Sequence, residues 1–403
     1  MSAGAAAAPT ASSEKHRAAG VAFGAHALHD GYTDLIYVML PVWQAEFGLG
    51  YFALGLMKSA FSGTLAAFQI PSSMVAERLG APLVLALGTA LAGFGYVIAG
   101  ATSGVVILAA ALVLGGLGAS TQHPLASALI ARAFSGRQSM TALGTYNFAG
   151  DIGKMAVPAI GALMLTVMPW REAVTILGSL GALAGIAIYI FMPRLGAPAA
   201  AKDESKGEAK AATPGRPAAH GFPVLLSIGV IDSATRMGFL TFLPFVLTAK
   251  GAALPTIGLA LTLVFAGGAF GKLACAFIGA RLGAIGTVWL TETVTAVAIA
   301  ALLPLSLEAA MVLLPVIGVA LNGTSSVLYG SVPDLVEPSR HQRAFGIFYT
   351  GTIGAGAAAP SLYGLLGDAV GVNTTMLVIA AAVLLTLPLA AAMRGVMKSI
   401  AAA

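Results

Sequence analysis

The tetrapeptide Arg78-Leu79-Gly80-Ala81 occurs twice in this chain, because the same four residues return as Arg281-Leu282-Gly283-Ala284. The two copies lie 203 residues apart in a chain of 403 residues. Offsets of 203 or 202 superpose identical residues from several other segments: Leu40-Pro41 on Leu243-Pro244, Gly55-Leu56 on Gly258-Leu259, Gly144 on Gly346 and Pro158 on Pro360. A nearly constant offset predicts that the chain consists of two structurally related halves.

The composition indicates that the surface of both halves faces lipid. Hydrophobic residues make up 58% of the chain and charged residues only 9%. A soluble domain carries about 25% charged residues, so a cytosolic enzyme, a nucleic-acid-binding protein and a disordered protein are all excluded. The single cysteine, Cys275, allows no disulfide within the chain and no thiolate metal cluster.

Apolar segments of membrane-spanning length divide the chain into twelve predicted helices. A helix that crosses the hydrocarbon needs about 20 mostly apolar residues. The segments are 19–47, 51–76, 81–101, 104–133, 138–167, 171–193, 221–249, 254–279, 284–304, 307–333, 341–367 and 372–394. We therefore predict an all-α membrane protein with two pseudo-symmetric six-helix bundles.

The polar segments between these helices define four predicted regions. Residues 1–18 form an Ala-rich polar tail that lacks the short apolar run of a signal peptide. We therefore expect it to remain uncleaved, as a cytoplasmic tail. Residues 19–193 form the N-terminal bundle, and residues 221–403 form the C-terminal bundle with a short tail. Residues 194–220 are rich in Ala, Pro and charges, and are predicted to be a flexible cytoplasmic linker.

The basic residues predict the orientation in the membrane. Of the 21 Lys and Arg residues, fifteen fall on the side of the termini and the linker, four fall within spans, and only Arg171 and Lys250 fall on the opposite side. Cytoplasmic loops carry the excess of basic residues, so both termini are expected in the cytoplasm. The Ala- and Gly-rich composition favours a bacterial source, and hence the inner membrane.

Two parallel six-helix repeats with a site between them are typical of secondary transporters. The loop after the second span resembles the signature of the major facilitator superfamily through Glu77, Arg78 and Gly80. Gly153 and Pro158 in the fifth span are similar to the glycine-proline signature of antiporters in that superfamily. The resemblance implies the twelve-helix facilitator fold, with spans five and eight packed closely through these small residues.

Within that superfamily the chain resembles the fosmidomycin-resistance type of efflux protein. The matching pieces are His26-x-x-x-Asp30, Pro41, Gln69-x-Pro71, Gly118-Ala119-Ser120, His123-Pro124, Asn147 and Gly150. This resemblance implies proton-coupled export. Asp34, Asp151 and Lys154 stand outside its pattern.

Charged residues inside the predicted spans are the main candidates for function, because a charge at the bilayer centre costs from about 3 kcal/mol upward. Nine occur there, namely Asp30, Asp34, Asp151, Asp232, Glu292, Lys58, Lys154, Arg236 and Lys272. Counted from the span ends, Lys58 and Glu292 are expected near an interface, where they snorkel. Lys272 is expected to reach the cytoplasmic headgroups.

The repeat offset of 202 superposes Asp30 on Asp232 and Asp34 on Arg236. The first helices of the two halves are therefore expected to present charges at the same depth toward a common cavity. Arg236 either pairs with Asp34 across that cavity or with Asp232 along its own helix. In the second case the pair needs no ligand and is a structural lock. Asp151 and Lys154 are three residues apart and are expected to pair locally.

Roles follow from these positions. Asp30 is expected to exchange a proton with help from His26 and His123, because burial favours the neutral carboxyl group and histidine relays protons near neutral pH. Arg236 and Lys154 are expected to hold an anionic group of a substrate. The remaining predicted substrate-binding residues are Asp34, Gln122, Tyr146, Asn147, Asp151, Asp232, Asn322 and Tyr329. The predicted gating or structural residues are Glu77, Arg78, Gly80, Gly153, Pro158, Arg281 and Gly283.

Three functions remain as hypotheses. The first is proton-coupled antiport, by alternating access, that exports a small polar or anionic compound. The second is proton-linked uptake or exchange of an organic anion such as a carboxylate or phosphonate, which the buried cations favour. The third is a sensor or assembly factor with the same fold, against which the lack of a large polar domain in the sequence argues. No nucleophile-base arrangement, phosphate loop or metal-ligand cluster is visible, so the expected energy source is the proton gradient, without cofactor, metal or nucleic acid, in a monomer.

Overall fold

The computed structural model describes residues 11–134, 136–193, 221–337 and 340–401. The described part of the first half forms seven helices: α1 (Ala11–Phe47), α2 (Tyr51–Leu79), α3 (Ala81–Ala101), α4 (Val105–Ala119), α5 (Gln122–Ala133), α6 (Gly136–Met164) and α7 (Trp170–Phe191). The described part of the second half forms α8 (Gly221–Ala249), α9 (Leu254–Leu302), α10 (Leu307–Gly330), the short 3-10 helix η1 (Pro333–Leu335), α11 (His341–Val370), α12 (Val372–Val383) and α13 (Thr386–Ala401). No strand occurs among the described residues, and the expected all-α fold is confirmed.

The helices differ from the predicted spans at four places. The predicted span 104–133 is broken between α4 and α5, and the last span is broken between α12 and α13. Conversely, α9 contains two predicted spans, joined at Gly283, whose backbone has φ 69°. Helix α1 begins at Ala11, so the second part of the predicted tail 1–18 is helical, because its Ala-rich sequence lets the helix continue. Residues 1–10 and the predicted linker 194–220 lie outside the described residues.

The repeated tetrapeptide forms the same turn in both halves. Gly80 ends α2 with φ 90°, and Gly283 divides α9 with φ 69°. Positive φ is costly for residues with a Cβ atom, and glycine adopts it readily. The repeat in the sequence is thus a repeat of a backbone turn between two antiparallel spans.

Eight helical stretches among the described residues are long and apolar enough to cross a membrane. The remaining long helices α1, α2, α6 and α11 are not among the eight. Helices α1, α2 and α6 carry most of the polar side chains that the first half presents to the space between the halves, and α11 adds Tyr349 and Thr352. The polar side chains of the second half in this space come mostly from α8, α9 and α10, which are apolar enough to be among the eight.

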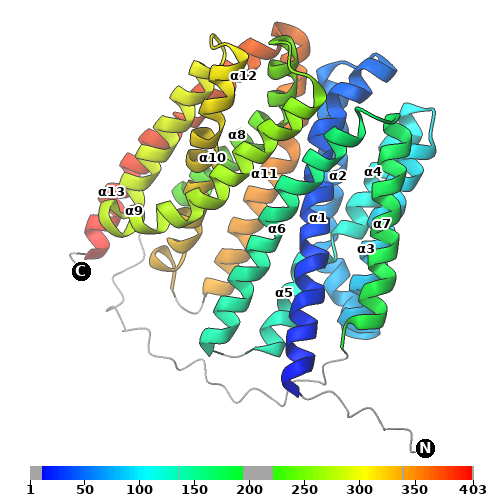
Figure 1. The fold of residues 1–403 in the computed structure, drawn as a ribbon. Coiled ribbons are helices and arrows are strands. Elements are labelled where there is room, and N and C mark those ends of the chain that lie inside the picture. Colours follow the sequence, from blue (N-terminus) through cyan, green and yellow to red (C-terminus); the bar gives the residue numbers. More distant parts are fainter. Residues whose placement is uncertain (1–10, 135, 194–220, 338–339, 402–403) are drawn as a thin grey trace, which may run out of the picture.

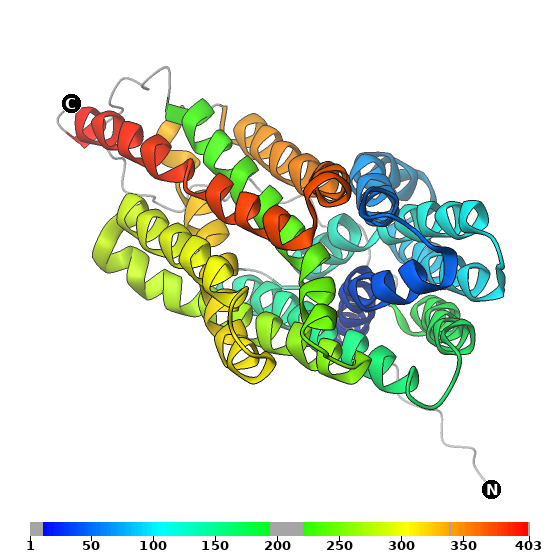
Figure 2. The ribbon, with the colours of Figure 1, turned by 90° about the horizontal axis from the view of Figure 1, so that it is seen from above.

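The two halves lie side by side, with α1 to α7 on one side and α8 to α13 on the other (Figure 1). The view from above shows the same division (Figure 2). Among the described residues, the halves are joined chiefly by α2 with α11, α6 with α9, and α1 with α8 and α9.

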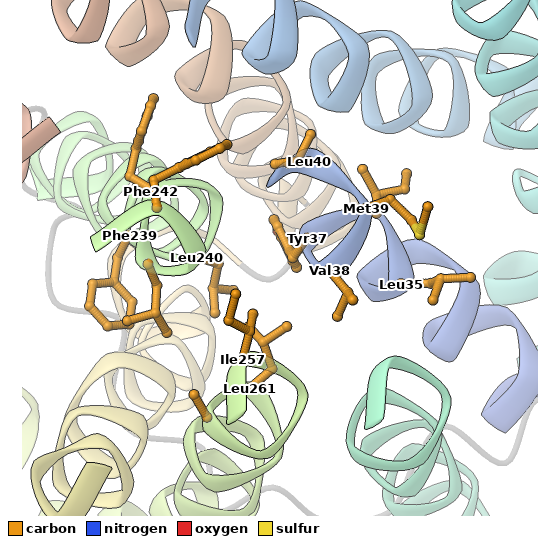
Figure 3. Close-up of a cluster of buried hydrophobic side chains, with 14 of the residues drawn as sticks. Leu35, Tyr37, Val38, Met39, Leu40, Phe239, Leu240, Phe242, Ile257 and Leu261 are labelled. Atoms are coloured by element: carbon orange, nitrogen blue, oxygen red, sulfur yellow. The ribbon is translucent and has the colours of Figure 1, made fainter. Parts of the chain in front are cut away.

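A buried apolar cluster closes the space between the halves at the end where α1 finishes. Val38 and Leu40 of α1 belong to it, together with Leu240 of α8 and Ile257 and Leu261 of α9. Figure 3 shows Val38, Leu240 and Ile257 facing one another between the three helices. Their burial removes apolar surface from the central space and holds this end of the molecule shut.

Close backbone and polar contacts reinforce the same end. A Cβ atom on Gly55 of α2 would collide with the carbonyl oxygen of Pro360 in α11. Nearby, the Ser361 hydroxyl donates to the Ser59 hydroxyl at 2.7 Å. The carboxylate of Asp368 accepts hydrogen bonds from the backbone N–H groups of Tyr51, at 2.6 Å, and Phe52, at 3.0 Å. Asp368 of the second half thus caps the first turn of α2.

Candidate functional site

A cavity of about 620 Å³ lies between the two halves. Its wall includes Asp30 and Asp34 of α1, Asp151 and Lys154 of α6, Asp232 and Arg236 of α8, Lys272 of α9, and residues of α2, α10 and α11. The apolar cluster and the close contacts of Gly55 lie near the end of α1. On each helix that joins the halves, the cavity-lining residues lie farther from that end than these contacts do. The cavity therefore opens toward the end of the molecule where α1 begins.

Asp30 lies at the centre of a polar cluster in the first half. One carboxylate oxygen, Oδ1, is 3.3 Å from His26 Nε2, 3.8 Å from His29 Nε2 and 3.7 Å from His123 Nε2. The other oxygen, Oδ2, is 3.2 Å from the Lys154 ammonium. Asp30 is only 5% exposed, so Lys154 supplies the positive charge that a buried carboxylate requires.

His26 presents its Nε2 atom to Asp30 because its other ring nitrogen is occupied. Nδ1 lies 2.8 Å from the backbone carbonyl of Tyr146, to which it donates, and the ring stacks on the Tyr146 ring with centroids 3.8 Å apart. In a neutral imidazole with its proton on Nδ1, Nε2 carries a lone pair. The lone pair on His26 Nε2 and the lone pairs on the Asp30 carboxylate repel each other. A proton held between these two atoms removes the repulsion and makes the contact favourable.

Two glycines bring α6 against α1 at this point. A Cβ atom on Gly150 would lie 2.6 Å from Asp30 Oδ2, and a Cβ atom on Gly153 would collide with the carbonyl oxygen of Ala27. The predicted role of Gly153 between spans five and eight is therefore wrong, because it packs on span one. Spans five and eight do approach closely, but through Gly258, where a Cβ atom would lie 2.6 Å from Ala162.

The main partner of Asp151 is Lys272, not Lys154. The Lys272 ammonium donates to both oxygens of Asp151 at 2.7 Å, whereas Lys154 lies 3.9 Å from the same carboxylate. Lys272 projects from α9 into the cavity, so the prediction that it reaches the headgroups is wrong. The opposite charge of Asp151 stabilises it there.

In the second half, Arg236 Nη2 donates to Asp232 Oδ2 at 3.0 Å along α8. Of the two predicted partners of Arg236, the structure therefore selects Asp232. Asp34 lines the cavity and forms no ion pair among the described residues.

Lys58 and Glu292 are both 1% exposed, so the prediction that they snorkel to an interface is wrong. Lys58 donates to the Thr33 carbonyl at 2.7 Å and lies 4.3 Å above the Tyr37 ring centroid. Counting residues from the ends of a span predicts how deep a side chain lies in the membrane, but not which side of the helix it is on. Both side chains are on the bundle-facing side of their helices.

The comparisons with known proteins agree with this architecture. The model of the Major Facilitator Superfamily matches residues 22–231 and 225–399, which cover most of the chain. The chain belongs to the major facilitator superfamily. It is accordingly an integral, multi-pass membrane protein that transports a small-molecule substrate, and it is not an enzyme.

Several curated facilitators are similar in sequence. A probable sulfoacetate transporter of Cupriavidus necator is 26% identical over 83% of both chains. The fosmidomycin resistance protein of Escherichia coli K12 is 29% identical over 40% of both chains. A probable L-galactonate transporter of the same organism is 30% identical over 36% of this chain and 32% of its own.

Solved facilitator structures share the fold at low identity. A bacterial homologue of the lysosomal transporter Spinster, in an inward-facing and unoccupied conformation, superposes with a TM-score of 0.78 and 16% identity, covering 96% of this chain and 98% of its own. A point mutant of the nucleoside transporter NupG gives a TM-score of 0.73 and 15% identity, covering 95% of this chain and 99% of its own.

The other predicted binding residues of this facilitator divide into two groups. His123, Asn322 and Tyr329 line the cavity. Gln122 and Tyr146 are buried beside the Asp30 cluster and do not line it, and Asn147 is exposed without lining it. The side-chain amide of Gln122 has no hydrogen-bond partner among the described residues.

The predicted gate residues lie at the open end of the facilitator. Glu77, Arg78 and Arg281 are exposed, and among the described residues they form no ion pair.

Pro158, which was also predicted to be a gating or structural residue, is buried within α6. Its carbonyl oxygen would lie 3.4 Å from a Cβ atom on Gly258.

Sequence reasoning missed one polar face of the cavity. Tyr349, Thr352 and Gly356 of α11 line the cavity, and Ser325 of α10 joins them. Their spacings of three and four residues place the α11 residues on one helix face. That spacing is the signal that would have found them, although none of these residues carries a formal charge.

His26, Asp30 and His123 offer ligand atoms that lie within 4.8 Å of one another, as a metal site requires. The Lys154 ammonium is 3.2 Å from the same carboxylate. A divalent cation bound there would be repelled by that ammonium, so the cluster fits a proton better than a metal ion.

Proposed function

We propose that this facilitator moves a small organic anion together with a proton, and that Asp30 is the group that binds the proton. The observation that carries this proposal is the position of Lys154, which lines the cavity and is 3.2 Å from Asp30. One ammonium group is thus available both to the buried carboxylate and to a ligand in the cavity.

The charge balance then links the two binding events. An anionic substrate that recruits Lys154 leaves Asp30 without its counter-charge. A buried carboxylate without a counter-charge is more stable as the neutral acid, so substrate binding favours protonation of Asp30. Because binding linkage is reciprocal, a proton on Asp30 frees Lys154 and favours the anion. His26 and His123, which contact Asp30, supply a route for that proton.

The cavity supports an anionic substrate in a second way. Lys154, Arg236 and Lys272 all reach its wall, and each is held by a carboxylate that a substrate group can replace. Two of the similar proteins are named for organic anions, sulfoacetate and L-galactonate. We infer the same substrate class here, carried by the proton gradient without a cofactor.

Coupling of this kind favours co-transport, which is the second hypothesis from the sequence. Antiport requires that substrate and proton compete for one group, as a cationic substrate and a proton would compete for Asp30. The similarity to a fosmidomycin resistance protein supports export, so the sign of the coupled proton movement is the decisive quantity. We also infer the bacterial inner membrane, with both termini and the open end of the cavity in the cytoplasm.

The test uses the purified protein in liposomes that contain a pH-sensitive dye. Sulfoacetate, galactonate, fosmidomycin and a lipophilic cationic drug are added outside, one at a time and without an imposed gradient. Co-transport of an anion and a proton acidifies the interior, whereas antiport makes it alkaline. We expect acidification with anions, which is reduced in Asp30→Asn and unchanged in Asp334→Asn, a variant with the same substitution at an exposed position in η1.

Each alternative outcome contradicts a specific part of the proposal. An alkaline interior with anions overturns co-transport in favour of the antiport hypothesis. A response to the cationic drug alone overturns the anionic substrate class. Undiminished proton movement in Asp30→Asn removes Asp30 from the mechanism.

A further inference from the structure

The second half contains a pair of buried carboxyl groups that the proposed function does not use. Glu292 of α9 is 1% exposed and Asp232 of α8 is 3% exposed. The two carboxyl groups lie close enough to interact with each other, and the Thr324 hydroxyl, which donates to Thr291 at 2.6 Å, is the other polar neighbour of Glu292. The Oε1 atom of Glu292 has no hydrogen-bond partner among the described residues.

The charges around this pair do not balance unless it holds a proton. From α8, only Asp232 and Arg236 act on Glu292, and α10 offers the uncharged Thr324. The described part of α12 has no charged residue, and Arg394 of α13 instead stacks over the Trp289 ring at 4.6 Å. Arg236 bonds to Asp232, so Glu292 has no cation within 4 Å among the described residues.

Two carboxyl groups in contact cannot both ionise in a buried site. With one proton shared, Arg236, Asp232 and Glu292 sum to zero charge, and Glu292 donates to the Asp232 carboxylate. Asp232 and Arg236 line the cavity, whereas Glu292 does not. Proton exchange between the pair and the cavity therefore passes through Asp232.

We propose that Asp232 and Glu292 form a second proton-binding site, which opens to the cavity through Asp232. Without substrate, the pair shares one proton and Arg236 neutralises the remaining negative charge. The repeat offset of 202 makes Asp232 the counterpart of Asp30. Each half then holds one carboxylate that a cavity-lining cation neutralises, beside a buried group that can hold a proton.

The coupling of this second site rests on the proposed function. A substrate anion that draws Arg236 away leaves the pair with one proton and one uncompensated negative charge. The Asp232 carboxylate then takes one further proton from cavity water, and gives it back when Arg236 returns. Together with Asp30 this makes two protons per substrate, which compensates the charge of a dianion.

Infrared spectroscopy of the protein in lipid tests the resting proton without any substrate. A protonated carboxyl group gives a carbonyl stretch that is separate from the carboxylate bands and shifts in D₂O. At neutral pH we expect one such band to disappear in Glu292→Gln and to persist in Glu308→Gln, which changes an exposed glutamate at the start of α10. In Asp232→Asn the band is expected to shift, because its hydrogen-bond acceptor changes. A spectrum unaffected by both Glu292→Gln and Asp232→Asn would overturn the shared proton.

Titration calorimetry tests the coupling. With sulfoacetate as the probe, the dependence of the binding heat on the ionisation enthalpy of the buffer gives the number of protons taken up. We expect two protons for the wild type and for Glu308→Gln, one for Asp30→Asn, and one for the double variant Asp232→Asn with Glu292→Gln. Uptake of one proton, lost only in Asp30→Asn, overturns the second site and leaves the proposed function intact. Binding without proton uptake, or no binding of sulfoacetate, counts against the proposed function, and the infrared result then decides the carboxyl pair by itself.

Discussion

Gly153 sets the distance between α1 and α6, and with it the distance between Asp30 and Lys154. A Cβ atom there would collide with the backbone of Ala27, which cannot move aside as a side chain can. We expect Gly153→Ala to destabilise the protein by about 1–3 kcal/mol, as overpacking does, and to lower transport. The measurement is thermal unfolding in detergent together with anion-driven proton flux.

Gly144→Ala is the matched control on the same helix. A Cβ atom at Gly144 would have no other atom within 4 Å, so this variant is expected to unfold at or slightly above the wild-type temperature. Equal melting temperatures for Gly153→Ala and Gly144→Ala would show that α1 and α6 are not packed as described.

For single residues, the sequence predicts which charged side chains matter better than it predicts which ion pairs they form. The pairing of Asp232 with Arg236 follows from a spacing of four residues on one helix. The pairing of Asp151 with Lys272 joins residues 121 positions apart, and nothing local indicates it. The burial of Lys58 and Glu292 was missed for a related reason, because the rotation of a helix that is apolar on all sides is set by its neighbours.

Gly283 is the residue that turns α9 into two spans. Its φ of 69° is compatible with glycine and costs other residues about 1–2 kcal/mol. We expect Gly283→Ala to lower the unfolding free energy by about that amount, whereas Gly279→Ala, whose added Cβ atom would meet nothing closer than 3.7 Å, serves as the unstrained control. Thermal or denaturant unfolding of both variants in detergent measures the difference. Equal stabilities would mean that the turn adopts another conformation.

The elements themselves were largely predictable, because apolar length and polar breaks determine where a chain can cross a bilayer. The break between α4 and α5 was not predictable. There the Ser120 hydroxyl donates to the Leu117 carbonyl at 2.7 Å, and the Thr121 hydroxyl donates to the Gly118 carbonyl at 3.0 Å. Such side-chain hydrogen bonds compete with the helix ladder without changing the apolar pattern that located the span.

For the molecule as a whole, the repeat in the sequence predicted two related halves and a common cavity, but not which end is closed. That end is determined by contacts between residues about 300 positions apart, such as Ser59 with Ser361. Alternating access requires these contacts to break while the open end closes. The stability of the closed end therefore controls how often the cavity faces the opposite side.

Asp368 is the charged contact at this closed end, because its carboxylate accepts from the backbone N–H groups of Tyr51 and Phe52 across the two halves. It also lies at the N-terminus of α2, where negative charge is stabilising. Since Asp368 is exposed, we assign these contacts on the order of 1 kcal/mol, which corresponds to roughly a fivefold change in the balance between the two conformations.

We expect Asp368→Ala to shift the population toward the state that is open at this end. The shift is measured with a membrane-impermeant maleimide, applied from this side to a cysteine at Ser62 in a Cys275→Ser background. Labelling should accelerate about fivefold in Asp368→Ala, less in Asp368→Asn, which keeps one acceptor oxygen, and not at all in Asp334→Asn. Unchanged labelling in Asp368→Ala would mean that the apolar cluster of α1, α8 and α9 holds this end shut without help from the carboxylate.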